Sequence, residues 1–176
     1  MKLRIKNTNL TIKIVSWLQI VGGITGIGLM VYLMVQTGAI NGAMMVIFLF
    51  GLALFSYSIH AGKTLLTETN KLKGIVLSII NQCLQVVHFS LFGYGLSYSS
   101  GAEIALGFQE ATFKVSASAI MSSFKMALFT DDPFFVKINV FAIVIIVVLL
   151  DIEKELQSED EGPSQEEVQV QVKDVL

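Results

Sequence analysis

Five polar side chains recur at helical spacing within one long apolar stretch, between Gly74 and Tyr98. They are Ser78, Asn81, Gln82, Gln85 and His88. Side chains three and four positions apart lie on the same side of an α-helix, so these five share one helix face. At about 1.5 Å of rise per residue, Asn81 lies ~10 Å and His88 ~21 Å along the axis from Gly74. In a helix that crosses a bilayer, the amides therefore lie near mid-depth.

Polar groups at that depth need hydrogen-bond partners, and titratable ones are candidates for function. Two interpretations of the predicted intramembrane polar site at Asn81, Gln82, Gln85 and His88 stay open. In the first, which we favour, the side chains make interhelical hydrogen bonds that fix the register of a bundle. In the second, they line a pocket for a proton or a ligand, centred on His88.

Other chemical signals are weak. The sequence has no HExxH, CxxC or GxSxG motif, and its glycine-rich stretch at 22–28 lacks the lysine of a phosphate-binding loop. In antiparallel neighbouring helices, His60 lies more than about 20 Å from His88, so the two cannot share a metal or a haem. A single cysteine, Cys83, excludes an internal disulfide. The sequence therefore predicts no enzyme, no metal site and no cofactor.

The composition is that of a membrane protein. Hydrophobic residues make up 53% of the chain and charged residues 15%, against about 25% charged in a soluble domain, and the mean hydropathy is +0.70. Four apolar runs approach the ~20 residues needed to cross a bilayer, at about 14–35, 43–61, 74–98 and 134–150. The fold class expected is an all-α membrane protein, with four transmembrane helices in a bundle over 14–156. Within the first run, Gly22 and Gly26 form a GxxxG step that suits close helix packing.

The charges predict the orientation. Basic residues gather in the N-terminal segment 1–13 and in the segment 62–73, and the positive-inside rule places both in the cytoplasm. Four spans then return the C-terminus to the same side of the cell membrane. The acidic tail 157–176 contains Gly162 and Pro163 and is expected to be disordered.

The outside segment 99–133 shows a different periodicity. Polar and apolar residues alternate at 103–108 and at 112–119, which predicts strands, and 122–129 fits a strand or a short helix. We expect a small extracytoplasmic β element between the third and fourth helices. It should lie outside the hydrocarbon, because open sheet edges are not tolerated in lipid.

The leading function hypothesis is a non-enzymatic accessory or scaffold subunit. The lipid bilayer is one partner, and proteins would bind through the outside loop 99–133 or the C-terminal tail. The alternative is a small carrier or binding protein for an apolar ligand, which uses the polar face of the third helix. The few basic residues lie at a membrane edge, so nucleic acid is not an expected partner.

Overall fold

The computed structural model describes residues 7–38, 40–67, 71–109, 112–118, 122–128 and 134–160. These residues form both helices and a sheet, so the all-α fold expected above is wrong. The helices are α1 (Thr8–Thr37), α2 (Gly42–Leu66), α3 (Lys71–Cys83) and α4 (Val140–Asp160). The strands, all between α3 and α4, are β1 (Val87–Leu91), β2 (Tyr94–Ser99), β3 (Glu103–Gln109), β4 (Thr112–Ser118), β5 (Ser123–Leu128) and β6 (Phe135–Asn139).

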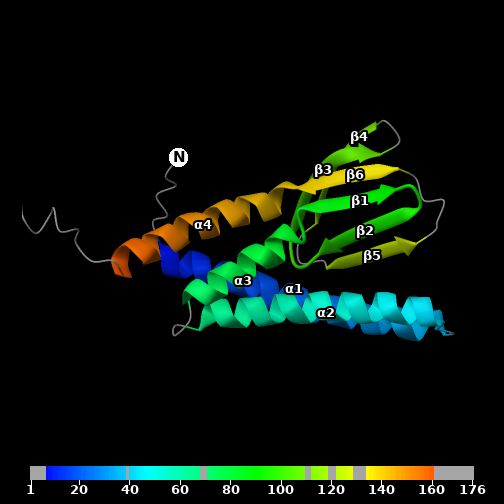
Figure 1. Cartoon of the computed structure of the whole chain (residues 1–176), viewed down its shortest axis with the longest axis horizontal. Coiled ribbons are helices and arrows are strands. Elements are labelled where there is room, and N and C mark those ends of the chain that lie inside the picture. Colours follow the sequence, from blue (N-terminus) through cyan, green and yellow to red (C-terminus); the bar gives the residue numbers. More distant parts are fainter. Residues whose placement is uncertain are drawn as a thin grey trace, which may run out of the picture.

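The long helices α1 and α2 form a pair that runs the length of the described structure (Figure 1). The shorter helices α3 and α4 lie beside one half of this pair, and the sheet lies beside the other half (Figure 1). The sheet therefore does not lie beyond the helix ends, where the β element was expected. Gly22, near the middle of α1, touches the turn between β2 and β3: a Cβ added there would collide with the backbone of Gly101.

The helix ends follow from local chemistry. α1 stops where Gly38 takes a φ of +67°, a left-handed conformation that glycine adopts without strain. The Asn41 side chain then accepts a hydrogen bond of 2.9 Å from the Met44 N–H and caps the start of α2. Asn139 does the same for α4, because its Oδ1 accepts the Ala142 N–H at 3.3 Å.

The third predicted span, 74–98, is wrong because its second half is a hairpin. α3 ends at Cys83, a tight turn follows, and β1 and β2 then pair antiparallel. Residues 87–99 alternate apolar with polar or small side chains, which is the period of a strand and not of a helix. At the tip, Phe92 and Gly93 both have positive φ, which is the geometry of a two-residue hairpin turn.

The fourth predicted span, 134–150, is wrong for the same reason. In its first part, Val136 and Ile138 alternate with Lys137 and Asn139, and the structure forms β6 there before α4 begins. The strands expected within 103–108 and 112–119 are confirmed as β3 and β4, and at 122–129, where a strand or a short helix was predicted, the structure forms the strand β5.

The six strands form one antiparallel sheet in the order β4-β3-β6-β1-β2-β5. Cross-strand partners lie on the same face of a sheet, so the register sorts the side chains into two faces. One row across β4, β3, β6 and β1 is Val115, Leu106, Ile138 and Val87. The adjacent row is Lys114, Gly107, Lys137 and His88. The sheet therefore has one apolar face and one polar face.

Two apolar clusters hold the helices and the sheet together. At one end, buried side chains from all four helices pack together: Ile12, Val15, Leu65, Ile75, Ile145, Leu149 and Ile152. At the other end, Met30, Phe55 and Tyr98 join α1, α2 and β2. A Cβ at Gly26 would collide with the Phe55 ring, so Gly26 lets α2 pack closely on α1.

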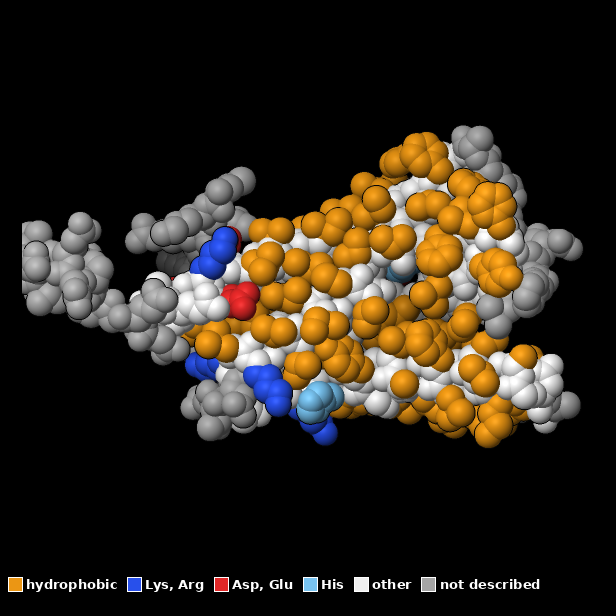
Figure 2. Space-filling model, viewed as in Figure 1, with side chains coloured by type: hydrophobic (Ala, Val, Ile, Leu, Met, Phe, Trp, Pro, Cys, Tyr) orange, Lys and Arg blue, Asp and Glu red, His pale blue; other side chains and the backbone are white. Residues whose placement is uncertain are grey.

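Among the described residues, two helices are long and apolar enough to cross a membrane, α1 and α2. Only 33% and 17% of their most apolar windows are buried inside the protein, whereas the core helix of a soluble protein is mostly buried. The prediction of a four-span bundle is wrong, because α3 has only 13 residues and the second half of α4 is acidic. Figure 2 shows hydrophobic side chains over both the helices and the sheet, with the charged ones gathered at the end away from the sheet.

The two terminal segments also differ from their predicted bounds. Helix α1 begins at Thr8, inside the segment 1–13 that was expected to precede the first helix. Helix α4 continues to Asp160, inside the tail predicted to be disordered from 157. Residues 1–6 and 161–176 lie outside the described part of the chain, and with them most of the basic segment and of the acidic tail.

Candidate functional site

The five polar residues predicted on one helix face are all buried, but three elements carry them. Ser78, Asn81 and Gln82 lie on α3, Gln85 lies in the turn after it, and His88 lies on β1. The break after Cys83 separates the amides from the imidazole. As a result, the Asn81 amide faces the neighbouring helices α1 and α2, whereas His88 faces the polar side of the sheet.

Asn81 lies at the centre of a buried hydrogen-bonded cluster, which we call the polar seam. The seam consists of Gln19, Ser58, Asn81, Gln85, Tyr98 and Ser100. The Asn81 Nδ2 donates to Gln19 Oε1 at 3.3 Å and to Ser58 Oγ at 3.2 Å. These two bonds tie α3 to α1 and to α2, and they use both donors of the amide.

Tyr98 connects the sheet to the seam. Its hydroxyl lies 3.2 Å from Asn81 Oδ1 and 3.0 Å from the Leu54 carbonyl oxygen, and its ring packs on Phe55 with 5.4 Å between centroids. The residue is 1% exposed. Burial raises the pKa of the Tyr98 phenol well above its usual range, so the hydroxyl stays protonated and donates to these acceptors.

Gln85 and the serines complete the seam. Gln85 donates to the Asn81 carbonyl at 3.2 Å, and its Oε1 accepts the Ser100 N–H at 2.8 Å. Ser58 donates its single proton to the Gln19 carbonyl at 3.0 Å, so Ser100 must be the donor in the 3.0 Å contact between the two hydroxyls. Nearly every polar atom of the seam therefore has a partner, with Gln19 Nε2 as the exception within the described structure.

His88 lies between two hydrogen-bond acceptors. Its Nε2 is 3.2 Å from the Gln85 carbonyl oxygen, and its Nδ1 is 3.5 Å from a carboxylate oxygen of Glu103. Because a carbonyl oxygen can only accept, Nε2 must carry a hydrogen. The imidazole of His88 therefore lies within ion-pair distance of the Glu103 carboxylate on the polar face of the sheet.

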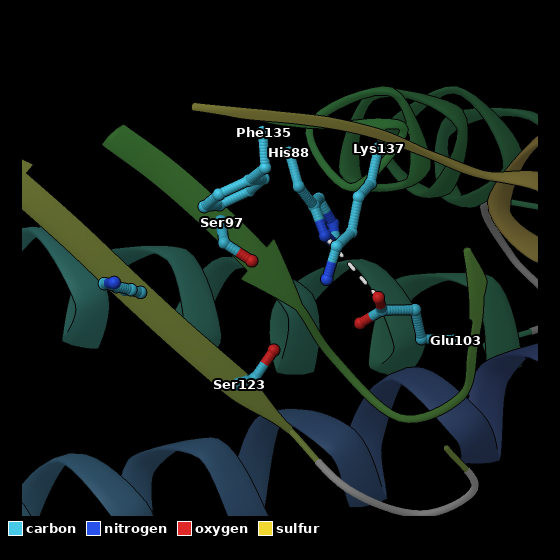
Figure 3. Close-up of a pocket in the computed structure, with 7 residues that line it drawn as sticks. His88, Ser97, Glu103, Ser123, Phe135 and Lys137 are labelled. Carbon is cyan, nitrogen blue, oxygen red and sulfur yellow. Dashed lines mark ion pairs between the residues drawn. The ribbon is translucent and has the colours of Figure 1, made fainter. Parts of the chain in front are cut away.

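A cavity of about 330 Å³ opens beside this pair, on the polar face of the sheet. We call it the sheet cavity. Its lining comes from five of the strands: His88, Ser97, Glu103, Ser123, Lys125, Phe135 and Lys137. Figure 3 shows that the labelled side chains come from different strands and surround one space. A flat sheet cannot bring five strands to one cavity of this size, so the sheet curls around it with the polar face inside.

The lining of the sheet cavity is electropositive. Among the described lining residues, the two ammonium groups of Lys125 and Lys137 outnumber the one carboxylate, which belongs to Glu103. The Lys137 ammonium lies 5.4 Å from the centroid of the Phe135 ring, a cation–π contact that leaves its hydrogens available to an acceptor. Glu103 is the only carboxylate among the described residues of the lining. The described residues contain no group of three or more His, Cys, Asp or Glu placed to hold a metal ion.

Most residues of the cavity and several of the seam were missing from the sequence prediction. Lys137 lies within the predicted fourth span and Glu103 within the predicted outside segment, and neither was predicted as a site residue. The period-two pattern of 87–99 and 135–139 is a signal for His88, Ser97 and Lys137, because it predicts strands whose polar side chains share one face. In comparisons with known proteins, no family model, no curated protein and no solved structure matches this chain.

Proposed function

We propose that this protein is a membrane-embedded binding protein for a small anionic ligand, which occupies the sheet cavity. The observation that carries the proposal is the lining: among its described residues, two lysines, a histidine and two serines face one cavity with a single carboxylate. Ammonium groups and hydroxyls are the donors that bind carboxylates and phosphates in proteins.

The size and polarity of the cavity support a small polar ligand. Its volume of about 330 Å³ lies at the lower end of the range for ligand pockets. Asn81 and Gln85, two of the amides that the alternative hypothesis placed in a pocket for an apolar ligand, hydrogen-bond within the polar seam instead. Of the predicted polar site, His88 alone lines the cavity, which favours an anion over an apolar molecule.

The contacts between helix ends support a placement in the cell membrane with both termini in the cytoplasm. Thr8 donates to Glu155 at 3.0 Å, and Lys71 lies 3.5 Å from Asn9, so the starts of α1 and α3 and the far part of α4 share one end. Lys63 is also at the end of α2 that leads to α3. Under the positive-inside rule, this end faces the cytoplasm, and the sheet lies toward the other side.

An accessory or scaffold role through protein partners stays a prediction. It relied on the outside loop 99–133, and most of the described part of that segment belongs to the sheet. The residues of the C-terminal tail beyond Asp160 lie outside the described structure.

Calorimetry on the full chain in mild detergent at low salt tests the binding proposal. The probes are inorganic phosphate and succinate, with glycerol as a neutral compound of similar size. We expect the anions to bind and glycerol not to bind. The double variant Lys125→Gln and Lys137→Gln should weaken anion binding by about tenfold or more, since a hydrogen bond to a charged group contributes roughly 1.5–3 kcal/mol.

A matched control is Lys154→Gln on α4, an exposed lysine at the opposite end of the molecule. This variant should bind the anions as the wild type does. Binding of glycerol with the same affinity as the anions, or anion binding that survives the double variant unchanged, overturns the proposal. So does an equal loss of affinity in the Lys154→Gln control.

A further inference from the structure

The two edges of the sheet differ in what covers them. The edge strand β5 lies against the helix pair: Ser122, just before it, donates to the Gly22 carbonyl, and Thr25 lies 2.9 Å from the Ser122 hydroxyl. The Phe124 ring of β5 lies 6.3 Å from the ring of Phe50 on α2. The edge strand β4 pairs with β3 through all seven of its residues, and no described strand pairs with its other side.

An open edge is costly in the place where β4 lies. Every residue of a strand has a backbone N–H and C=O, and about half of these groups on an edge strand point away from the sheet. The sheet lies alongside α1 and α2, whose outward side chains are apolar (Figure 1 and Figure 2). In such apolar surroundings, unpaired backbone groups are not tolerated. The edge of β4 therefore needs a partner that supplies backbone hydrogen bonds.

The sequence of β4 is complementary to itself. If two copies pair antiparallel about a two-fold axis at Val115, then Phe113 faces Ala117, Lys114 faces Ser116 and Thr112 faces Ser118. No lysine faces a lysine, so the pairing brings no like charges together. The apolar residues of both copies fall on one face, because cross-strand partners share a face.

We propose that β4 pairs with β4 of a second copy of this chain, antiparallel about Val115, so that the two sheets join into one. Two-fold pairing uses the same surface on both copies, so the assembly is complete as a dimer and does not extend to further copies. Phe113 and Val115, which are 56% and 63% exposed in the single chain, then lie on the continuous apolar face of the joined sheet. The open edge is removed from both copies at once.

Disulfide cross-linking in native membranes tests the register. Cys83→Ala removes the one cysteine, and single cysteines are then placed at Val115, at Phe113 and at Met126 on β5. In the proposed register, a cysteine at position 115 lies opposite the same position of the second copy. Val115→Cys should therefore form a covalent dimer in high yield under mild oxidation. Phe113→Cys alone should cross-link at least tenfold less, because its partner position is 117, and a mixture with Ala117→Cys should restore the yield.

Met126→Cys is the matched control on the other edge and should cross-link no more than Phe113→Cys alone. Mass measurement of the unmodified full chain in nanodiscs should give a dimer, and hydrogen exchange at the outward β4 amides should be slow. Equal yields at all positions, or a best yield at Phe113→Cys alone, overturns the proposal. A monomer overturns it too, whether its β4 amides exchange fast or are protected by another molecule.

Discussion

The polar seam and the sheet cavity are neighbouring groups of polar side chains, but the seam consists of neutral side chains bonded to one another, whereas the cavity has charged side chains around a space. In the seam, Asn81 bonds to three side chains from α1, α2 and β2 within 3.3 Å. In the cavity, Lys137 and the serines face a space of about 330 Å³. The two regions meet at Gln85, whose side chain belongs to the seam and whose carbonyl accepts from His88.

This difference separates structural from binding roles in physical terms. A buried polar group with all its partners inside the protein stabilises the fold, and removing one partner leaves the others unsatisfied. A polar group that faces a cavity can exchange water for a ligand at little cost to the fold. The same kind of substitution should therefore affect stability in the seam and affinity in the cavity.

Asn81→Leu should give the largest effect. It removes one hydrogen bond each from Gln19, Ser58 and Tyr98 and leaves the buried Gln19 side chain without a partner among the described residues, so we expect the free energy of unfolding to fall by about 3 kcal/mol or more. Thermal unfolding of the full chain in detergent measures this. The matched control on the same face of α3 is Ser78→Ala, because the Ser78 hydroxyl is buried without a partner among the described residues. A control that loses as much as Asn81→Leu would show that the seam adds nothing specific.

Tyr98→Phe should cost about 1–2 kcal/mol at pH 8, since it removes the hydrogen bonds to Asn81 and Leu54. The cost should shrink above pH 10. The folded phenol has a raised pKa and keeps its proton, whereas the unfolded phenol ionises near pH 10. Above that pH, wild-type stability falls by up to about 1.4 kcal/mol per pH unit from this group. Unfolding of both proteins between pH 8 and 11 gives the difference, and a difference that does not change with pH contradicts the inferred burial.

Glu103→Gln tests the cavity side of the comparison. The change removes the one carboxylate found among the described lining residues, so it should raise the affinity for inorganic phosphate by several-fold to tenfold. The free energy of unfolding should change by less than about 1 kcal/mol, because the contact between Glu103 and the His88 ring is long, at 3.5 Å. Glu153→Gln on α4 serves as the control for removing a negative charge far from the cavity. Weaker phosphate binding in Glu103→Gln would mean that the carboxylate positions a donor and does not simply repel the ligand.

The sequence indicated the polar seam better than the cavity. The spacing of Asn81 and Gln85 pointed to buried amides whatever the fold, because both positions stay on or next to the helix. His88 could not be placed, since its position depends on where α3 stops. Hydropathy over 74–98 is high in either conformation, and only the alternation after Val86 separates a strand from a helix. Glu103 and Lys137 reach the cavity through the pairing of β3 with β6, a long-range contact that no local pattern encodes.

Ser58→Ala and Ser90→Ala give the most direct comparison, because the same substitution is made at a buried serine of the seam and at a buried serine on the polar face of the sheet. Both hydroxyls are buried, at 2% and 0% exposed. Ser58 contacts Gln19, Asn81 and Ser100, whereas the Ser90 hydroxyl, on the polar face of the sheet, has no partner among the described residues. We expect Ser58→Ala to cost about 1–2 kcal/mol and Ser90→Ala to lie within about 0.5 kcal/mol of wild type, or to stabilise it. Thermal unfolding in the same detergent measures both. If Ser90→Ala costs as much as Ser58→Ala, the Ser90 hydroxyl is hydrogen-bonded as fully as the Ser58 hydroxyl, and the contrast between the seam and the polar face of the sheet fails at this position.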